Sequence, residues 1–109
     1  MSGNLPTPRL RVPRSARAGE AVEIRTLIEH PMETGLRHEG ARAVPRDLLN
    51  RMVVRVNGEV ALQAELRNGT SANPYHVFFL RLDRTSEIEV AFSDERGRTT
   101  RATARIAVG

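Results

Sequence analysis

The sequence predicts an all-β fold, an immunoglobulin-like antiparallel β-sandwich of about seven strands. Apolar and polar residues alternate with period two in seven short runs, a pattern that places one side of each strand on a core and the other in water. Turn-forming stretches rich in Gly, Asn, Asp and Pro separate the runs. A length of 109 residues suits a single domain, and 39% hydrophobic with 28% charged residues is typical of a globular one.

The seven alternating runs are the expected strands, in chain order. They cover residues 9–12, 21–28, 51–56, 60–66, 76–82, 87–92 and 100–108. Between the second and third runs, residues 45–51 (PRDLLNR) predict one short helical turn, because proline suits the first turn of a helix. We expect residues 1–8 to be a flexible N-terminus and residues 9–109 to be the sandwich domain.

The Asn57-Gly58 pair marks a tight connection between the third and fourth runs. A two-residue loop in a regular ladder would set Val54 opposite Ala61 and mismatch the two apolar faces, whereas register follows the buried face. We therefore predict a three-residue loop with Gly58 at positive φ and a bulge. This register aligns the apolar residues of the two strands and puts Val60 on the buried face.

Composition excludes several classes of function. The chain has no cysteine, so it can form neither a disulfide framework nor a thiolate nucleophile nor a cysteine-type zinc site of its own. All 17 basic residues are arginines spread along the chain, the net charge is only +4 and aromatic residues are few, which does not favour nucleic-acid binding. No apolar run reaches the length of a membrane span, and the first twenty residues contain no apolar segment typical of a secretory signal.

The segment 29–39 (EHPMETGLRHE) places His30, Glu33, His38 and Glu39 close together. Their spacing matches no common zinc pattern, so we expect no metal and no cofactor. No serine lies in a nucleophile-elbow pattern and no glycine loop could cradle phosphate, so we assign no catalytic residue and do not expect an enzyme. Triad partners can lie far apart in a sequence, so an enzyme with a dispersed site stays an alternative.

Three stretches of this chain resemble the SoxZ family. They are HPMETGLR at residues 30–37, VPRDLLNRMVVRVNGE at 44–59 and SANPY at 71–75, and the resemblance extends from Arg9 to Val108. SoxZ is the small, cysteine-free subunit of the SoxYZ sulfur-carrier complex. The lysines usual in the family are arginines here, and residues 38–43 match it less well.

The resemblance implies a function and a location. SoxZ-like proteins are small immunoglobulin-like sandwiches that form a heterodimer with SoxY, whose C-terminal arm holds sulfur intermediates on a cysteine during thiosulfate oxidation. This chain would then be a non-catalytic scaffold that meets the other Sox enzymes transiently through the complex. It would be periplasmic, exported with its partner and without a signal peptide of its own.

Two loops and one strand supply the expected partner contacts. Pro31 stiffens the first loop, and Val77 and Phe79 make the VFFL stretch apolar on both faces, as in a strand that is covered on both sides. The loop residues could equally serve loop geometry alone. The expected interface residues are His30, Met32, Glu33, Gly35, Arg37, Asn73, Tyr75, Val77 and Phe79.

Other occupants and functions stay open at this point. A second copy of the chain, forming a homodimer, could cover the VFFL strand in place of SoxY. An immunoglobulin-like fold equally allows a generic periplasmic protein-binding or chaperone-type module, which would add a partner strand to a sheet edge.

Overall fold

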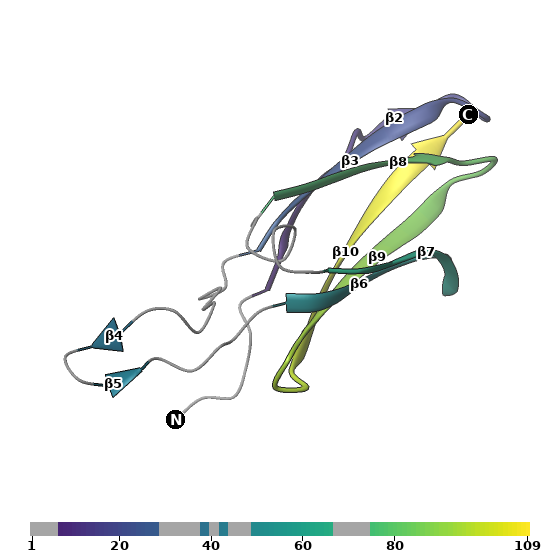
Figure 1. The fold of residues 1–109 in the computed structure, drawn as a ribbon. Helices are drawn as coiled ribbons and strands as arrows, with labels where there is room; N and C mark the ends of the chain where they lie inside the picture. Colours follow the sequence, from purple (N-terminus) through teal and green to yellow (C-terminus); the bar gives the residue numbers. More distant parts are fainter. Residues whose placement is uncertain (1–6, 29–37, 40–41, 44–48, 67–74) are drawn as a thin grey trace.

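The computed structural model describes residues 7–28, 38–39, 42–43, 49–66 and 75–109. The part of the chain that it describes is all-β and contains no helix, which confirms the predicted fold class. Two sheets form the two layers of a sandwich, and a short two-stranded pair extends from one end (Figure 1). The architecture is that of an immunoglobulin-like sandwich.

The smaller layer has the strand order β1-β3-β8 and consists of β1 (Arg9–Arg11), β3 (Ala21–Leu27) and β8 (Tyr75–Arg81). The larger layer has the order β2-β10-β9-β6-β7. Its strands are β2 (Ser15–Ala16), β6 (Leu49–Val56), β7 (Glu59–Glu65), β9 (Ser86–Asp94) and β10 (Thr99–Val108). The separate pair is β4 (His38–Glu39) with β5 (Arg42–Ala43). All neighbours are antiparallel except β2 and β10.

The predicted helical turn at residues 45–51 is wrong where the structure describes it. Residues 49–51 belong to β6, and residues 45–48 lie outside the described residues. Leu49 is fully buried and pairs with Asp94 of β9, and the ladder shifts between Leu49 and Arg51. Burial in the sheet therefore overrides the helix-start signal of Pro45.

The predicted three-residue loop at the β6–β7 hairpin is also wrong. Val56 pairs with Glu59, so only Asn57 and Gly58 form the loop. Both have positive φ, 53° and 87°, as the central residues of a type I′ turn do. The Asn57 side chain helps to hold this turn, because its Oδ1 accepts from the backbone N–H of Glu87 at 3.0 Å.

The apolar faces nevertheless match, because the bulge lies in β7 instead of in the loop. Arg55 pairs with Val60 and Val54 pairs with Leu62, so Ala61 is the extra residue. The expectation that the apolar residues of the two strands share one face was therefore correct, but a bulge within β7 aligns them instead of a three-residue loop. In consequence Val60 lies outside the core, with 54% of its surface exposed.

The core between the layers is built almost entirely from aliphatic side chains. Phe78 and Phe92 are its aromatic members, in agreement with the scarcity of aromatics in the sequence. The ring of His76 packs near that of Phe92, with centroids 5.4 Å apart. The fully buried apolar side chains are Ile24, Ile28, Leu49, Val54, Ile88, Val90, Phe92 and Ile106.

One buried ion pair fixes the β9–β10 turn. The Asp94 side chain is fully buried, and its Oδ1 accepts from the backbone N–H groups of Arg96 and Arg98, each at 3.0 Å. Its Oδ2 accepts from Nε of Arg98 at 2.8 Å and from Nη2 at 2.6 Å. A buried carboxylate with this many donors is satisfied only while all of them are in place.

Alternation along β8 separates its side chains sharply. Phe78 is 8% exposed, whereas Tyr75, Val77 and Phe79 on the other face are 61%, 54% and 64% exposed. Strand geometry causes this, because successive side chains point to opposite faces of a sheet. The expectation that the chain alone leaves one face of the VFFL strand uncovered is confirmed for the described residues.

We predict that Asp94→Ala lowers the free energy of unfolding by about 3–5 kcal/mol, because it leaves the Arg98 guanidinium without its buried partner. Urea denaturation of the isolated chain measures this. Asp83→Ala, which removes an exposed acid from the β8–β9 turn, is the control and should change stability by less than about 0.5 kcal/mol. Equal stability of the two variants would contradict the structural role of the pair.

We predict opposite behaviour for the two neighbouring phenylalanines. Phe78→Ala should cost about 3–5 kcal/mol of stability, since it empties a core position. Phe79→Ala should change the stability of the isolated chain by less than about 1 kcal/mol, since that ring is in water. Similar losses in both variants would mean that Phe79 is covered in the monomer.

Candidate functional site

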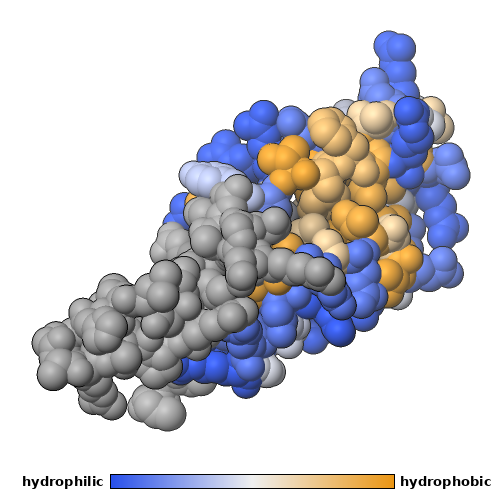
Figure 2. Space-filling view, viewed as in Figure 1, coloured by the Kyte–Doolittle hydropathy of each residue, from blue (hydrophilic) through white to orange (hydrophobic). Residues whose placement is uncertain are grey.

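The candidate site is the uncovered side of β8, which we call the β8 strip and define as Tyr75, Val77 and Phe79. These three side chains share the outward face of the smaller sheet. Figure 2 shows apolar side chains gathered in one patch over β8 and the strands beside it, with hydrophilic residues around the patch. An exposed apolar patch of this kind, rimmed by polar residues, marks an interaction surface.

β8 is also an edge strand, since the sheet order places only β3 beside it in the described part of the chain. Natural edge strands carry charges, prolines or bulges that prevent pairing with other chains. β8 has none of these over residues 75–80, and its one charged residue is Arg81 at the end. An edge with so little protection is consistent with a strand that another chain covers.

Core side chains beneath this edge are only half-buried. Leu80 of β8 faces inward, as does Leu62 of β7, and both pack against the buried core while keeping part of their surface exposed. β7 is an edge strand of the larger sheet, so in the described part of the chain both strands form open edges of the sandwich. The apolar surface therefore extends beyond the β8 strip itself.

Charged side chains of β3 and β1 lie along one side of the β8 strip. Cross-strand partners in β3 are Leu27 for Tyr75, Arg25 for Val77 and Glu23 for Phe79. Leu27, Tyr75 and Val77 line a groove of about 480 Å³ together with Thr26 and the arginines Arg9, Arg11 and Arg25. The groove is apolar along β8 and cationic along β1.

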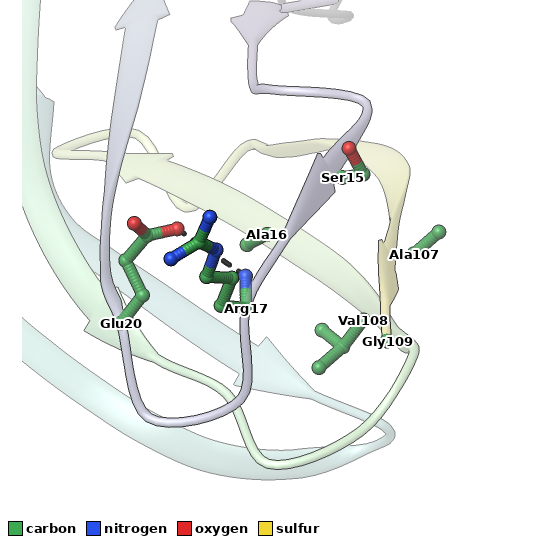
Figure 3. A pocket seen from close by; sticks show the side chains of 7 residues that line it. All are labelled: Ser15, Ala16, Arg17, Glu20, Ala107, Val108 and Gly109. Carbon is green, nitrogen blue, oxygen red and sulfur yellow. Dashed lines mark hydrogen bonds between the residues drawn. The ribbon is translucent and has the colours of Figure 1, made fainter.

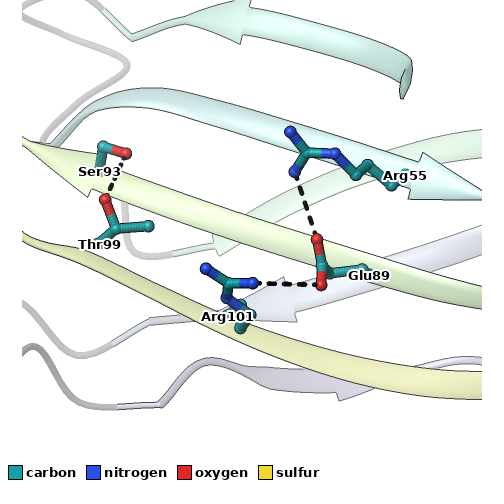
Figure 4. Close-up of polar contacts among 5 residues, drawn as sticks. All are labelled: Arg55, Glu89, Ser93, Thr99 and Arg101. Atoms are coloured by element: carbon teal, nitrogen blue, oxygen red, sulfur yellow. Dashed lines mark hydrogen bonds and ion pairs between the residues drawn. The ribbon is translucent and has the colours of Figure 1, made fainter. Parts of the chain in front are cut away.

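The outward face of the larger sheet has a different character. Glu89 of β9 lies between Arg55 and Arg101, with N–O distances of 3.3 and 3.8 Å (Figure 4). Ser93 and Thr99 hydrogen bond to each other at 3.1 Å on the same sheet. Charges that are already paired in this way suit a solvated face.

A second hollow lies where β2 meets the end of β10 (Figure 3). It is lined by small and backbone groups, and its charged members are Arg17 and Glu20. Glu20 Oε1 accepts from the backbone N–H of Arg17 at 3.2 Å, so this carboxylate is used to hold the turn. The described residues that line it include no histidine and no second carboxylate that could form an acid–base pair with Glu20.

Metal ligands do not gather in the described part of the chain, which contains no group of three His, Cys, Asp or Glu side chains able to hold an ion. For His38 and Glu39 the structure describes the backbone alone, as part of β4. Within the described ranges there is likewise no helix that is long and apolar enough to cross a membrane.

The predicted interface residues divide into two groups. Tyr75, Val77 and Phe79 come together as the β8 strip. The remaining candidates lie outside the described residues and stay predictions; they are His30, Met32, Glu33, Gly35, Arg37 and Asn73.

Two features of this surface were not predicted from the sequence: the proximity of Arg9, Arg11 and Arg25, and the exposure of Val60. The RLR alternation at residues 9–11 was a signal for two arginines on one strand face. The sequence did not show that these two arginines lie near Arg25, because this follows only from the pairing of β1 with β3.

Comparison with known proteins gives one family match. The sequence model of the family described as "Sulphur oxidation protein SoxZ" matches residues 10–105. No curated protein matches the chain significantly.

Solved structures share the fold at low sequence identity. A superoxide reductase (neelaredoxin) from Ignicoccus hospitalis superposes with a TM-score of 0.75 and 15% identity, covering 96% of this chain and 82% of its own. The sulfur carrier protein SoxY from Chlorobium limicola f thiosulfatophilum superposes with a TM-score of 0.65 and 14% identity, covering 98% and 87%. At such identities the likeness shows the fold alone.

The family match spans nearly the whole chain and agrees with the sandwich fold and the motifs at residues 30–37 and 71–75. This chain belongs to the SoxZ family and is a subunit of the Sox sulfur-oxidation system.

Proposed function

We propose that this chain is the non-catalytic scaffold subunit of a SoxYZ-type sulfur carrier, which binds and orients a cysteine-bearing SoxY-type subunit. The observation that carries the proposal is the β8 strip, an exposed apolar edge strand in a member of the SoxZ family. Tyr75, Val77 and Phe79 offer large apolar contact area, and aromatic side chains are enriched at the centres of interfaces.

The division of labour follows from the side chains available. Covalent attachment of a sulfur intermediate requires a thiolate, and this chain has no cysteine. The partner supplies the thiol, and this chain supplies a rigid sandwich that holds the partner. The other Sox enzymes meet the carrier through the complex, and the pair works in the periplasm, to which this chain is exported with its partner.

The fold of the SoxY structure supports this arrangement in one respect. SoxY and this chain share the same sandwich architecture, so the proposed heterodimer is built from two domains of one fold. A face that is left uncovered in one subunit can then be matched by a sheet of similar curvature in the other.

A second candidate function is a generic immunoglobulin-like periplasmic protein-binding or chaperone-type module. The unprotected edge of β8 is the observation that favours it, because such an edge can accept a strand from an extended peptide. The two functions differ in their partner, which is a folded sandwich subunit in the first and an unfolded segment in the second.

The proposed function predicts which polypeptide becomes covalently modified during thiosulfate oxidation. When the chain is incubated with a SoxY-family subunit of the same organism, thiosulfate and the oxidising enzymes, the adduct should form on the partner's cysteine and the mass of this chain should stay unchanged. Intact-protein mass spectrometry distinguishes the two polypeptides. A stable adduct on this chain would overturn the scaffold role.

The complex itself should depend on the β8 strip. We expect Phe79→Asp to weaken binding to the same SoxY-family subunit by 2 kcal/mol or more, roughly 30-fold, because it places a charge at a desolvated centre. Gln63→Asp, which makes an exposed change on β7, is the control and should bind normally. Wild-type affinity in Phe79→Asp, measured by titration calorimetry, would place the interface elsewhere.

A further inference from the structure

Three arginines stand together at the margin of the β8 strip; we call Arg9, Arg11 and Arg25 the arginine cluster. Arg9 and Arg11 are two residues apart on β1 and therefore share a face. The β1–β3 register sets Arg11 directly opposite Arg25 and Arg9 directly opposite Leu27. The next strand across is β8, where Val77 is the partner of Arg25. One cross-strand row thus reads Arg11, Arg25, Val77.

The cluster lacks balancing negative charge. Arg25 holds Glu23, with Nε 3.2 Å from Oε1, whereas the side chains of Arg9 and Arg11 form no hydrogen bond or ion pair with any residue that the structure describes. Among the described residues on the outward face of the smaller sheet, Glu23 is the one carboxylate against four guanidinium groups, those of the cluster and that of Arg81. Arg81 is already engaged, since its Nη1 donates to the carbonyl of Gly19 at 2.6 Å.

This arrangement is unfavourable for the chain alone. Like charges that face each other directly across an antiparallel pair destabilise a sheet. The Arg11–Arg25 pairing therefore lowers the stability of the monomer. An anionic group placed between or over the two guanidinium groups would turn this repulsion into a net attraction. Arginine is well suited to receive such a group, because its planar fork matches a carboxylate with two hydrogen bonds.

Apolar and cationic groups line the same groove. Arg9 and Arg11 line it from β1, Tyr75 and Val77 line it from β8, and Arg25 and Leu27 of β3 lie between them. A surface that fills the groove must therefore offer apolar side chains to β8 and negative charge to β1 in a single docking event.

We propose that the arginine cluster receives carboxylates of the protein that covers the β8 strip, so that the partner's docking surface is apolar at its centre and acidic along one margin. The inference rests on the proposed function, since the partner is the SoxY-type subunit. Beyond the proposed function, it specifies that the partner's docking surface carries negative charge and that Arg9, Arg11 and Arg25 recognise this charge. Opposite charges at an interface rim accelerate association and reject wrong partners.

The same charges argue against a second copy of the chain as the occupant. Two copies that cover each other through this face would bring two arginine clusters into one interface, with one glutamate from each side to balance them. Juxtaposed like charges reject a partner instead of selecting it. The occupant is accordingly a different protein that carries the opposite charge.

The Arg11→Glu variant tests this and separates binding from folding. Glutamate opposite Arg25 replaces a repulsive pair by an attractive one, so the melting temperature of the isolated chain should equal or exceed that of the wild type. Its association rate constant with the SoxY-family subunit of the same organism should nevertheless fall about tenfold at 50 mM NaCl. The difference should shrink to about twofold or less at 500 mM, because salt screens exposed charges. Arg84→Glu, the same charge change on the exposed β8–β9 turn, is the matched control.

Each other outcome contradicts the inference in a recognisable way. Equal association rates for Arg11→Glu and Arg84→Glu would overturn the inference about the arginine cluster but not the proposed function. A wild-type chain that does not bind the SoxY-family subunit would overturn both the inference and the proposed function. Faster association of Arg11→Glu would mean that the partner brings positive charge. A wild-type homodimer in sedimentation that Val77→Asp dissociates would assign the face to a second copy. Binding of thiosulfate or sulfate that Arg11→Glu abolishes, with unchanged subunit association, would make the cluster a small-anion site.

Discussion

Strict alternation along β8 is the constraint on which the rest of the molecule depends. The core needs Phe78 from this strand, and a strand that turns one side chain inward must turn its neighbours outward. Val77 and Phe79 are therefore in water because Phe78 is not. With β3 on one side and no strand pairing the other edge among the described residues, the smaller layer has an apolar outer face and an open edge at the same place.

The outward faces of the two sheets differ in how their charged side chains are paired. On the larger sheet, the outward carboxylate of Glu89 is paired with Arg55 and Arg101. On the smaller sheet, the side chains of Arg9 and Arg11 have no such partner among the described residues, and exposed aromatic rings of β8 lie on the same face. A protein that is optimised only for its own stability would not combine these features, but a subunit that is completed by another chain can retain them.

The sequence predicted the strands well because aliphatic alternation is a local signal. Each of the seven alternating runs overlaps one of the long strands or β1, and the core forms where the alternation places it. Residues 49–51 were misassigned because Pro45 and the absence of alternation favoured a turn, whereas the burial of Leu49 is a long-range effect. The β6–β7 hairpin shows the same limit. The sequence predicted that the apolar faces of the two strands align, but it did not predict that the bulge lies at Ala61.

The site was predictable to the extent that one strand defines it. VFFL is apolar on both faces, so the exposure of Val77 and Phe79 followed from the sequence alone. The arginine cluster did not, because Arg11 and Arg25 lie far apart in the chain and meet only through the β1–β3 register. Counted along the sequence, these arginines belonged to a scattered set of 17, and the sheet makes three of them a group.

The central claim is that the partner covers the outward face of β1, β3 and β8. Hydrogen-exchange mass spectrometry of the isolated chain and of its complex with the SoxY-family subunit tests this most directly, because amides of an open edge strand exchange readily until another chain covers them. The account predicts strong protection on binding in peptides that span residues 75–81, with smaller protection in residues 9–11 and 21–27. Protection confined to β6, β9 and β10, with no change in β8, would contradict it.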